Sequence, residues 1–440
     1  MIAVIAATRV VFIIPGLLGL SAGLVSLLQR TCGNVLTSQL YPSRTPCEIP
    51  LEHADVSGST GGRDDRNQET SEGGIVVTKR QATIADVARR AGVSTATAGR
   101  VLGGYGYSSG EKRDLVLKAA EDLGYRPNQL ARSLITGRTR TIGFVAGDIQ
   151  SPFFAKILRG VSDVLEPKGF GLLITNSDET VEGEMESIRL LSEKQVDGVI
   201  LSPCDVEEAA HLRKLVQTTP MVLIDRQVAD LDVDSVGVDS VAAAEACVRR
   251  LIAEGHRRIG MVAELQFGPW TDIESFVRMV RTNPDGIGAI YPSWQRFMGY
   301  VRAHDACDLP LDLSLIARVN SYSTEDTKAT VLRLLGHPDG PSVLFTADGL
   351  MTEGTMMAIF ERGLRIPDDI SLVAFDDLDW MSFIGPGIDS IGQPRRKMGE
   401  AAARMLIERI GGFDGPPRRE KLPVRDNRRG SVCVLATGRD

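Results

Sequence analysis

Carboxyl side chains follow several short apolar runs in this chain of 440 residues, and an arginine accompanies one of them. Asp225 and Arg226 stand at the end of one such run, and further aspartates follow other runs at Asp148, Asp239, Asp348, Asp376 and Asp377. Carboxylates and a guanidinium, with aromatic rings nearby, can hydrogen-bond to a polyhydroxylated ligand and stack on its faces. Each aspartate could instead only cap the helix that follows it.

The apolar runs alternate with stretches of helical periodicity, and this alternation predicts βαβ units. We expect strands at 141–146, 171–175, 198–201, 221–225, 259–263, 343–346 and 371–375. We expect helices at 153–166, 182–193, 241–253, 324–335 and 350–361. The predicted fold of this part is α/β, with parallel sheets that carry helices on both faces. Ligands of such sheets bind beyond the carboxyl ends of the strands, where the aspartates stand.

A different pattern precedes this region, where two short helices are predicted on either side of Gly92. Thr83 and Asp86 fit the Ser/Thr-x-x-acid pattern of a helix start. Gly92 can end the first helix because glycine readily takes a positive φ, and Ser94 can cap the second. The arrangement is a helix-turn-helix, which presents its second helix to the major groove of DNA. An ordinary helical hairpin in a core would show the same pattern.

The residues after this motif predict a third helix that Ser109 can cap and Gly124 can end. Pro127 disfavours a helix just before it, so the chain turns there. Asn128 can then cap a short fourth helix over 129–135. This helix has few apolar residues, and short isolated helices are marginal in water. We therefore expect it to fold only against DNA or a second copy of the chain.

Charge is distributed unevenly along the chain. Residues 79–140 contain twelve Lys and Arg against five Asp and Glu, a net charge of +7, whereas the whole chain has a net charge of −7. The remainder therefore carries −14. A basic segment in an acidic chain indicates nucleic acid as a partner. A solvated basic face is the plainer alternative, but it rarely coincides with a helix-turn-helix.

Over residues 81–440, the chain resembles the LacI/GalR family of bacterial transcription regulators, and it needs no gap through 81–140. The resemblance is carried by the helix-turn-helix over 83–102 and by Gly-Tyr-Arg-Pro-Asn-Gln-Leu-Ala-Arg-Ser-Leu at 124–134. It implies a headpiece that binds double-stranded DNA, a hinge helix and a sugar-binding core like that of the periplasmic binding proteins. It also implies homodimers or tetramers on near-palindromic operators, and a small, sugar-like effector.

By this resemblance, Thr95, Ala96 and Arg100 stand where the recognition helix reaches base edges, and Arg100 can donate twice to a guanine. Leu134 matches the residue that wedges into the minor groove. The full set expected to contact DNA is Thr83, Ser94, Thr95, Ala96, Thr97, Arg100, Ser109, Tyr125, Asn128 and Leu134. Gly99 and Gly103 replace polar residues that are common in the family, so some phosphate contacts could be lost.

For the core, the resemblance implies effector contacts from Asp148, Phe153, Phe154, Asp239, Arg296, Asp348 and Asp376. Asp348 and Gly349 stand where the family usually has Asn-Asp. An acid in place of the amide favours a ligand group that donates hydrogen bonds. Trp270 and Trp294 have no assigned place, because residues 264–290 form a longer segment than is usual in the family.

Nothing in the sequence supports an enzyme. The five histidines, at 53, 211, 256, 304 and 337, show no metal-ligand spacing, and no phosphate loop or dinucleotide fingerprint is present. We expect neither a cofactor nor a metal. The six cysteines are scattered, as in a protein of the reducing cytoplasm. The rival class is a sugar-binding receptor that uses the same core without DNA, and the basic headpiece argues against it.

Residues 1–76 form an unusual extension. The run over 10–28 is apolar and uncharged, long enough to be considered as a membrane span, and 29–75 has a disordered composition. A secretory signal is inconsistent with a DNA-binding domain just downstream. We favour translation from Val76 or Val77 over a membrane anchor, because Ser-Glu-Gly-Gly at 71–74 is what a translated purine-rich ribosome-binding site would give.

The expected organisation is an apolar and then disordered extension over 1–78, a headpiece over 79–126, a hinge helix and linker over 127–140, and a core over 141–440. Lobe 1 of the core is expected to comprise about 141–256 and 388–420, and lobe 2 about 257–387 and 421–440. We predict a DNA-binding transcriptional repressor whose operator affinity is set by a ligand in the cleft of the core. The sequence leaves open whether that ligand releases DNA or recruits the protein to it.

Overall fold

A small helical unit and a larger α/β unit are described by the computed structural model. The described residues are 10–12, 82–103, 108–125, 133, 137–207, 209–265 and 272–435. The two units separate between Gln129 and Leu130, and each is described by itself.

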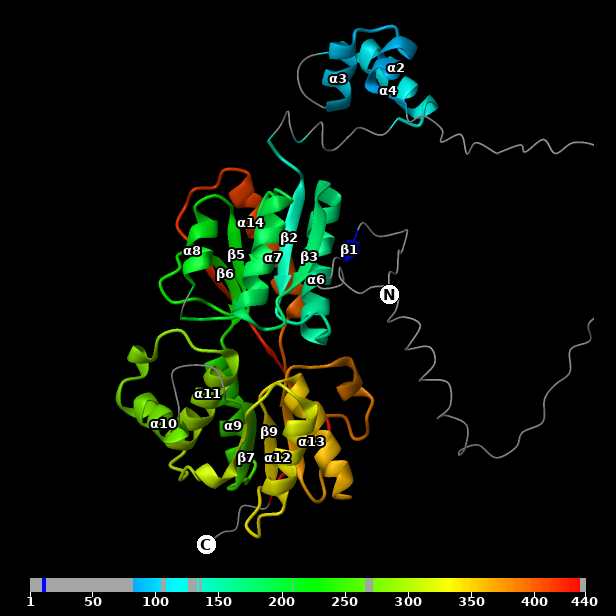
Figure 1. Cartoon of the computed structure of the whole chain (residues 1–440). Coiled ribbons are helices and arrows are strands. Elements are labelled where there is room, and N and C mark those ends of the chain that lie inside the picture. The colour runs from blue at the N-terminus through cyan, green and yellow to red at the C-terminus, as the bar shows by residue number, and fades with distance from the viewer. Residues whose placement is uncertain are drawn as a thin grey trace, which may run out of the picture. The chain divides into compact units, whose positions relative to one another are not determined.

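The helical unit consists of α2 (Ile84–Arg90), α3 (Thr95–Gly103) and α4 (Gly110–Asp122) (Figure 1). The predicted capping box at α2 is confirmed: the Asp86 N–H donates to the Thr83 hydroxyl, and the Thr83 N–H donates to the Asp86 carboxylate. Gly92 follows α2 with a φ of 65°. Small apolar side chains from all three helices and the first turn form one core: Val87, Ala88, Ala91, Ala98, Val116, Ala119 and Ala120.

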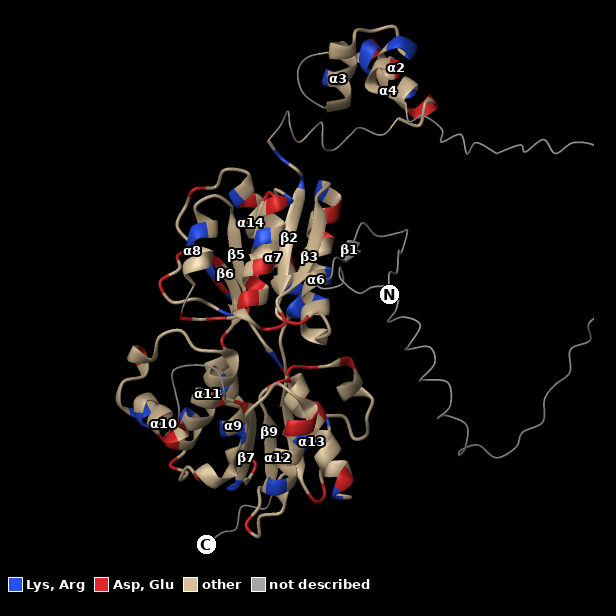
Figure 2. Cartoon of the chain, viewed as in Figure 1, with Lys and Arg blue, Asp and Glu red and all other residues tan. Residues whose placement is uncertain are grey.

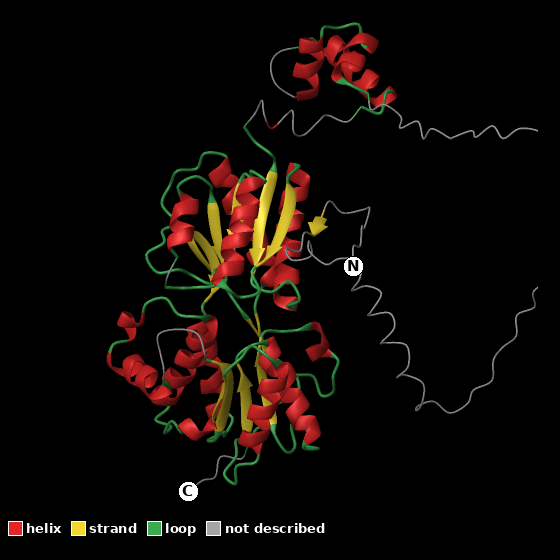
Figure 3. Ribbon diagram, viewed as in Figure 1, coloured by secondary structure: helices red, strands yellow, loops and turns green. Residues whose placement is uncertain are grey.

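The first lobe of the α/β unit is built on a sheet of seven described strands in the order β1-β3-β2-β4-β5-β6-β12, all parallel. Helices α6 and α14 pack on one face of this sheet, and α7 and α8 pack on the other (Figure 3). The central strands are almost wholly apolar, as expected of strands buried on both faces. The strands are β1 (Val10–Phe12), β2 (Thr141–Ala146), β3 (Gly171–Asn176), β4 (Gly198–Leu201), β5 (Met221–Ile224), β6 (Asp234–Val238) and β12 (Arg419–Leu422). The helices are α6 (Pro152–Leu165), η1 (Glu166–Lys168), α7 (Val181–Glu193), α8 (Ala210–Val216) and α14 (Arg395–Ile410).

Two glycines allow α6 and α14 to pack in close contact. A Cβ on Gly160 would lie 2.0 Å from the carbonyl oxygen of Arg396, and one on Gly399 would lie 2.1 Å from that of Ile157. Any larger residue at either position would force the helices apart. This contact fixes α6 on the sheet, and the N-terminus of α6 contributes to the cavity described below.

The second lobe is built on a sheet of six described strands in the order β13-β11-β10-β9-β7-β8, in which β13 is antiparallel and the others are parallel. Helices α9, α10 and α11 pack on one face, and α12 and α13 pack on the other. The strands are β7 (Ile259–Glu264), β8 (Ile316–Val319), β9 (Val343–Thr346), β10 (Ser371–Phe375), β11 (Asp389–Gly392) and β13 (Arg425–Asn427). The helices are α9 (Ser240–Ala253), α10 (Ile273–Thr282), η2 (Pro284–Ile287), α11 (Pro292–Ala306), η3 (Leu313–Leu315), α12 (Thr324–Leu335), α13 (Gly349–Glu361) and η4 (Asp379–Ser382).

The chain passes from one lobe to the other between β6 and α9, between β11 and α14, and between β12 and β13. The predicted lobe boundaries near 256 and 388 need correction, because α9 and β11 belong to the second lobe. Helix α9 buries Ala244, Val248 and Leu251 in the second core, and β11 pairs with β10. Periodicity shows that a helix has an apolar face but not which sheet that face covers.

All strands and helices predicted for the core are present, with bounds that differ by at most one residue at an end. The prediction lacked several elements that the structure contains. Among them, β12 (Arg419–Leu422) and β13 (Arg425–Asn427) are short and polar edge strands, so neighbouring strands rather than hydrophobicity define them. The predicted hinge helix over 129–135 lies outside the described residues, apart from Ser133.

Among the described residues, no helix is long and apolar enough to cross a membrane. Within the apolar run over 10–28, residues Val10–Phe12 form β1 and pair with β3 at the edge of the first sheet. The rest of the run and residues 29–81 lie outside the described residues. Translation from Val76 or Val77 therefore stays a prediction.

Candidate functional site

Helix α3 presents its predicted base-reading side chains to solvent. The Ser94 hydroxyl accepts a hydrogen bond from the Thr97 N–H at 3.1 Å, so Ser94 caps this helix as predicted. Ala98 is fully buried in the core of the helical unit, whereas Thr95, Ala96 and Arg100 are exposed. The first residues of α3 therefore form a surface of small side chains with one long cation.

Arg100 lies along its own helix. Its Nε is 3.4 Å from the Ala96 carbonyl oxygen, and an Nη is 3.5 Å from the Thr97 hydroxyl. Both distances are at the long end of the hydrogen-bond range, so these contacts are weak. The guanidinium can exchange them for the shorter, paired acceptors of a guanine edge.

Two basic residues of α2 are paired with acidic residues of the helical unit. Arg89 lies 2.6 Å from the Asp86 carboxylate, and Arg90 lies 3.4 Å from that of Asp122. Figure 2 shows basic and acidic residues interspersed along α2 and α4. Exposed pairs of this kind contribute little to stability and can open when a phosphate approaches.

The remaining predicted DNA contacts have different positions. Thr83 is engaged in the α2 capping box. Ser109 is the N-cap residue of α4, but its side chain makes no capping hydrogen bond, which corrects the predicted side-chain cap. Tyr125 packs against the core of the helical unit. Asn128 and Leu134 lie outside the described residues.

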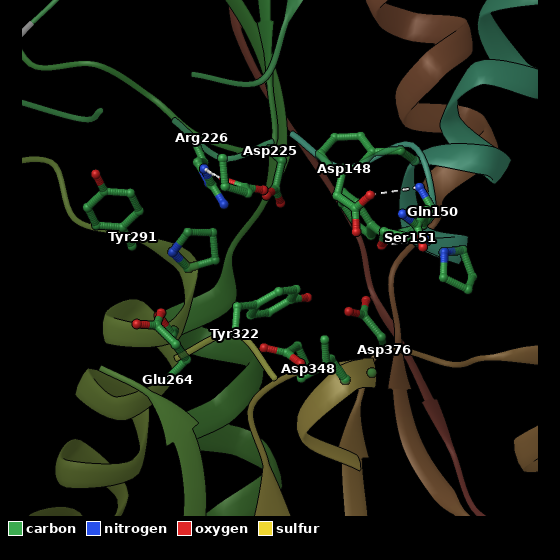
Figure 4. A pocket seen from close by; sticks show the side chains of 18 of the residues that line it. Asp148, Gln150, Ser151, Asp225, Arg226, Glu264, Tyr291, Tyr322, Asp348 and Asp376 are labelled. Carbon is green, nitrogen blue, oxygen red and sulfur yellow. Dashed lines mark hydrogen bonds and ion pairs between the residues drawn. The ribbon is translucent and has the colours of Figure 1, made fainter. Parts of the chain in front are cut away.

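A cavity of about 600 Å³ lies between the two lobes of the α/β unit, and both lobes line it. Its walls come from the loops that follow the parallel strands, because those carboxyl ends face the cleft (Figure 4). A cavity of this size can hold a mono- or disaccharide-sized ligand.

The wall from the first lobe begins at the N-terminus of α6. Asp148 follows β2, and its carboxylate accepts a hydrogen bond from the Gln150 N–H at 2.8 Å. Phe153 and Phe154 contact each other edge to face, with ring centroids 5.3 Å apart. These two rings provide the apolar surface on which the flat face of a ligand can stack.

Arg226 forms the polar part of the same wall. One Nη donates to the Glu179 carboxylate at 2.5 Å and to the Pro203 carbonyl oxygen at 3.1 Å. The guanidinium also lies over the ring of Tyr291, 5.5 Å from its centroid. Tyr291 belongs to the second lobe, so Arg226 is part of the contact between the lobes.

The wall from the second lobe is rich in acceptors. The Asp348 carboxylate caps α13 by accepting the Met351 N–H at 2.8 Å, and the Asp376 carboxylate accepts the side-chain amide of Gln393 at 2.8 Å. Arg296 is almost fully buried; one Nη donates to the Ala347 carbonyl oxygen at 2.6 Å. Its guanidinium carbon lies 4.0 Å from the centroid of the Phe375 ring.

Further contacts between the lobes lie beside the cavity, and two of them illustrate how the lobes are held. The Tyr291 hydroxyl donates to the Cys204 carbonyl oxygen at 2.8 Å. On an exposed rim, Lys156 of α6 forms an ion pair with Asp379 of η4. Both contacts depend on the present separation of the lobes, so any movement that opens the cleft must break them.

Two cavity carboxyl groups on opposite lobes have raised pKa values. Burial raises the pKa of Asp225 to about 6; Arg296 and Arg226 lower it, and Asp376 and Glu179 raise it further. Burial likewise raises the pKa of Asp348 to about 6, with Asp376 adding to the increase and the Met351 N–H and Arg296 opposing it. Asp225 therefore experiences charges from both lobes.

Of the residues predicted to contact an effector, Asp148, Phe153, Phe154, Arg296, Asp348 and Asp376 line the cavity. Asp239 does not; its side chain caps α9 and forms an ion pair with Lys421. Trp294 is buried in the second core beside Phe276, and Trp270 lies outside the described residues.

Sequence reasoning left several lining residues out of the predicted site. Asp225 and Arg226 stand at a strand end, so the strand-end rule had already drawn attention to them. Tyr291 precedes helix α11, and Tyr322 follows strand β8. Neither element was predicted from the sequence, so only the folded structure brings these two side chains to the cavity. Glu179, Glu264 and Gln393 are also among the lining residues that the sequence did not single out.

The cavity contains no activated thiol. Burial, together with the charge of Glu184, raises the pKa of the Cys204 thiol to about 12, so it stays protonated near neutral pH and is a poor nucleophile. No group of His, Cys, Asp and Glu suited to a metal ion occurs in the part of the chain that the structure describes.

Comparisons with known proteins match both units. Residues 83–128 match the bacterial regulatory proteins of the lacI family, and residues 139–429 match the periplasmic binding proteins and sugar binding domain of the LacI family. The transcriptional regulator PtxS of Pseudomonas plecoglossicida is 33% identical over 353 residues, which cover 80% of this chain and 96% of that protein. The transcriptional repressor CytR of Escherichia coli is 30% identical over 75% of this chain and 90% of that protein. The solved complex of the transcriptional regulator CelR with cellobiose aligns with a TM-score of 0.56 and 27% identity, over 80% of this chain and 99% of that one. These proteins are transcriptional regulators and not enzymes.

Proposed function

The chain belongs to the LacI family of DNA-binding transcriptional regulators, and we propose that it is a repressor whose operator binding is controlled by a sugar-like ligand in the cleft. One observation carries this proposal: a cavity lined from both lobes stands in the same chain as a helix-turn-helix of the LacI type. CytR is named a repressor, and CelR was solved with cellobiose, which supports both parts of the proposal.

In the proposed complex with DNA, α3 lies in the major groove and Arg100 carries most of the base recognition. Its neighbours Thr95 and Ala96 can offer a methyl contact or one hydroxyl bond. Thr83, Ser94, Thr97, Ser109, Tyr125 and Asn128 are proposed to contact the backbone and so fix the register. Leu134 is proposed to enter the minor groove and kink the duplex.

The twofold symmetry of the proposed complex follows from the way in which the family binds DNA. We propose that two copies pair, as a homodimer or within a tetramer, and place two recognition helices on a near-palindromic operator. The target is chromosomal DNA, so the proposed place of action is the bacterial cytoplasm.

Control requires that the ligand bind one arrangement of the lobes more tightly than the other. The cavity meets this requirement because its polar groups come from both lobes, so the contacts made to a ligand change when the lobes move. We propose that this movement alters the spacing of the hinge segments over 127–140 and thereby DNA affinity. Couplings of this kind amount to about 1–3 kcal/mol.

A binding assay tests the proposal. The full chain is titrated into fluorescent duplexes made from the region upstream of its own gene and from a shuffled sequence of equal length, at 150 mM salt. We expect tighter binding to the upstream duplex and a change in that affinity when neutral, acidic and aminated sugars are added in turn. Equal affinity for both duplexes under every condition would exclude the proposed function.

A further inference from the structure

The charge of the cavity lining is strongly one-sided. Among the described lining residues, eight are acidic and two are basic, and all the basic ones are arginines. The acidic residues are Asp148, Asp178, Glu179, Asp225, Glu264, Asp348, Glu353 and Asp376, and the basic ones are Arg226 and Arg296. A cavity with low-dielectric walls focuses such a field on the space that the ligand occupies.

The two arginines hydrogen-bond to the walls through their Nη atoms, while the Nε of each is buried without a hydrogen-bond partner. Arg226 donates to Glu179 and to the carbonyl oxygen of Pro203, and Tyr291 covers one face of its guanidinium. Arg296 donates to the carbonyl oxygen of Ala347 and lies against the Phe375 ring. The eight acidic side chains nevertheless outnumber the two guanidinium groups around the ligand space.

The part of the cavity in the second lobe offers acceptors in particular. Asp348, Asp376 and Gln393 are 8%, 5% and 6% exposed. Gln393 donates its amide to Asp376, and its own Oε1 is buried without a hydrogen-bond partner. Figure 4 shows Asp348 and Asp376 pointing into the same space beside the Tyr322 ring, with Asp225 facing them from the first lobe. A buried acceptor without a partner costs free energy that a donating ligand can recover.

We propose that the ligand of this cavity is an amino sugar, with its protonated amine held by Asp348 and Asp376. This proposal rests on the proposed function, because it specifies the ligand of that same site. An ammonium group supplies three donors and one positive charge, which match two carboxylates and the free Gln393 oxygen. The sugar hydroxyls then face the remaining carboxylates, and the rings of Phe153 and Tyr322 cover the apolar faces.

The other charge classes fit less well. A ligand with a carboxylate or phosphate would bring a further negative charge among the eight acids, at a separation where like charges repel strongly. A neutral sugar could donate hydrogen bonds but would displace water from the carboxylates without neutralising them, and uncompensated buried charge is costly. Burial raises the pKa values of Asp225 and Asp348, and the nearby charge of Asp376 raises both further.

Calorimetric titration of the full chain with matched sugars at pH 7 tests the proposal. The probes are D-glucosamine, D-galactosamine and D-mannosamine, each beside its neutral hexose and its uronic acid. We expect at least one amine to bind ten or more times more tightly than both of its counterparts. The proposal is overturned if no amine binds, or if a neutral sugar or uronic acid equals the best amine.

Two variants distinguish the proposed contact between Asp348 and the amine from a general effect of the protein's negative charge. Asp348→Asn removes the charge and retains an oxygen that can cap α13, so we expect it to fold and to lose at least tenfold in amine affinity. Asp272→Asn is the matched control, because Asp272 caps α10 through the Ser275 N–H and does not line the cavity. Equal losses in the two variants would overturn the assignment.

Proton release gives a readout that a merely structural role would not change. Titrations at pH 6 in two buffers of different ionisation enthalpy report protons exchanged on binding. A bound cation favours ionised carboxylates, so amine binding should release protons; proton uptake would contradict the proposal. DNA binding of the same samples is measured without sugar. Operator preference without amine binding refutes only the ligand, whereas amine binding without operator preference refutes the proposed function.

Discussion

The helical unit and the cleft between the lobes build their candidate sites in opposite ways. In the helical unit, the residues proposed to meet DNA lie close together in sequence, and the proposed base contacts Thr95, Ala96 and Arg100 on α3 are exposed. In the cleft, the polar groups come from strand ends spread from Asp148 to Gln393, and many are buried. The first site therefore depends on local sequence, whereas the second exists only when two sheets are folded with their carboxyl edges facing each other.

Unfolding the helical unit alone is the strongest test of whether the two candidate sites are independent. Ala98 is fully buried in the core of the helical unit, and Ala98→Asp would place an unpaired charge there at a cost of about 3–5 kcal/mol. We expect DNA binding to be lost while the melting transition and sugar binding of the α/β unit persist, as measured by calorimetry. Ala98→Ser is the milder control at the same position. Loss of sugar binding together with DNA binding would show that the two regions are not separable.

Removing a single charge from the cleft should weaken the response to ligand and leave DNA binding intact. Asp376→Asn preserves the side-chain shape, and asparagine tolerates the φ of 76° at this position. A lost charge-assisted hydrogen bond costs about 1.5–3 kcal/mol, so the ligand concentration that half-changes DNA affinity should rise about 10- to 100-fold. DNA affinity without ligand should not change.

The neighbouring Asp377 provides the control for that variant. Its carboxylate pairs with Arg429 and Ser390, and it does not line the cavity, so Asp377→Asn should leave the ligand response intact. A normal response in Asp376→Asn would remove Asp376 from the site.

The proposed recognition of DNA bases can be tested at one residue, Arg100. Arg100→Ala should weaken operator binding by about 1–3 kcal/mol and relax the preference at one base position of each half-site. Arg89→Ala, which removes an exposed cation of α2, should weaken binding evenly across sequences. Binding to a library of single-base operator variants distinguishes the two, and an unchanged preference in Arg100→Ala would refute the base contact.

The buried carboxyl group of Asp348 should make the stability of the α/β unit depend on pH. Its pKa is about 6 in the folded chain, against 3.8 for an ordinary aspartate, so the folded state binds this proton more tightly than the unfolded state. The free energy of unfolding therefore falls as pH rises from about 4 to about 6, and the cost is complete above that range. Asp348→Asn should be more stable than the parent at pH 7 by about 1–3 kcal/mol.

Denaturation at two pH values checks this prediction, because the gain should vanish at pH 4. Asp272→Asn is again the control: the hydrogen bond from Ser275 lowers the pKa of Asp272, so this variant should show no gain at pH 7. A gain for Asp348→Asn that is the same at both pH values would show that its carboxyl group does not titrate as proposed.

The smallest expected effect concerns the N-terminal caps of two helices in the helical unit. The Ser94 hydroxyl accepts the Thr97 N–H, whereas the Ser109 side chain makes no capping hydrogen bond. Ser94→Ala should therefore lower the free energy of unfolding of this unit by about 1 kcal/mol, and Ser109→Ala should change it by less than about 0.5 kcal/mol. Equal losses in urea denaturation would contradict the distinction.

The sequence predicted much of the fold because its signals are local. The capping box of Thr83 and Asp86, the turn at Gly92 and the apolar runs of the central strands each depend on neighbouring residues. Strands β12 and β13 could not be predicted in this way, because they are short and polar and exist through pairing with distant partners. The lobe to which α9 belongs could not be predicted either, because periodicity does not identify the sheet that a helix covers.

The candidate site in the cleft was predictable to the extent that it follows strand ends. Asp148, Asp348 and Asp376 follow strands that were predicted, and all three line the cavity. Asp239 follows a strand as well, but that strand leads into a crossing between the lobes, and the side chain pairs with Lys421 instead. Tyr291 and Gln393 lie beside elements that the sequence did not predict, so only tertiary structure brings them to the cavity.

The central claim is that a helix-turn-helix around α3 recognises one DNA sequence under the control of a ligand between the lobes. Its most direct test is the affinity of the full chain for its own upstream duplex and for a shuffled duplex, with and without a sugar that calorimetry shows to bind. We predict at least a hundredfold preference for the upstream duplex, and a change of about 5- to 150-fold when the sugar is present. Affinities that are equal for both duplexes, or that a bound sugar leaves unchanged, would contradict the claim.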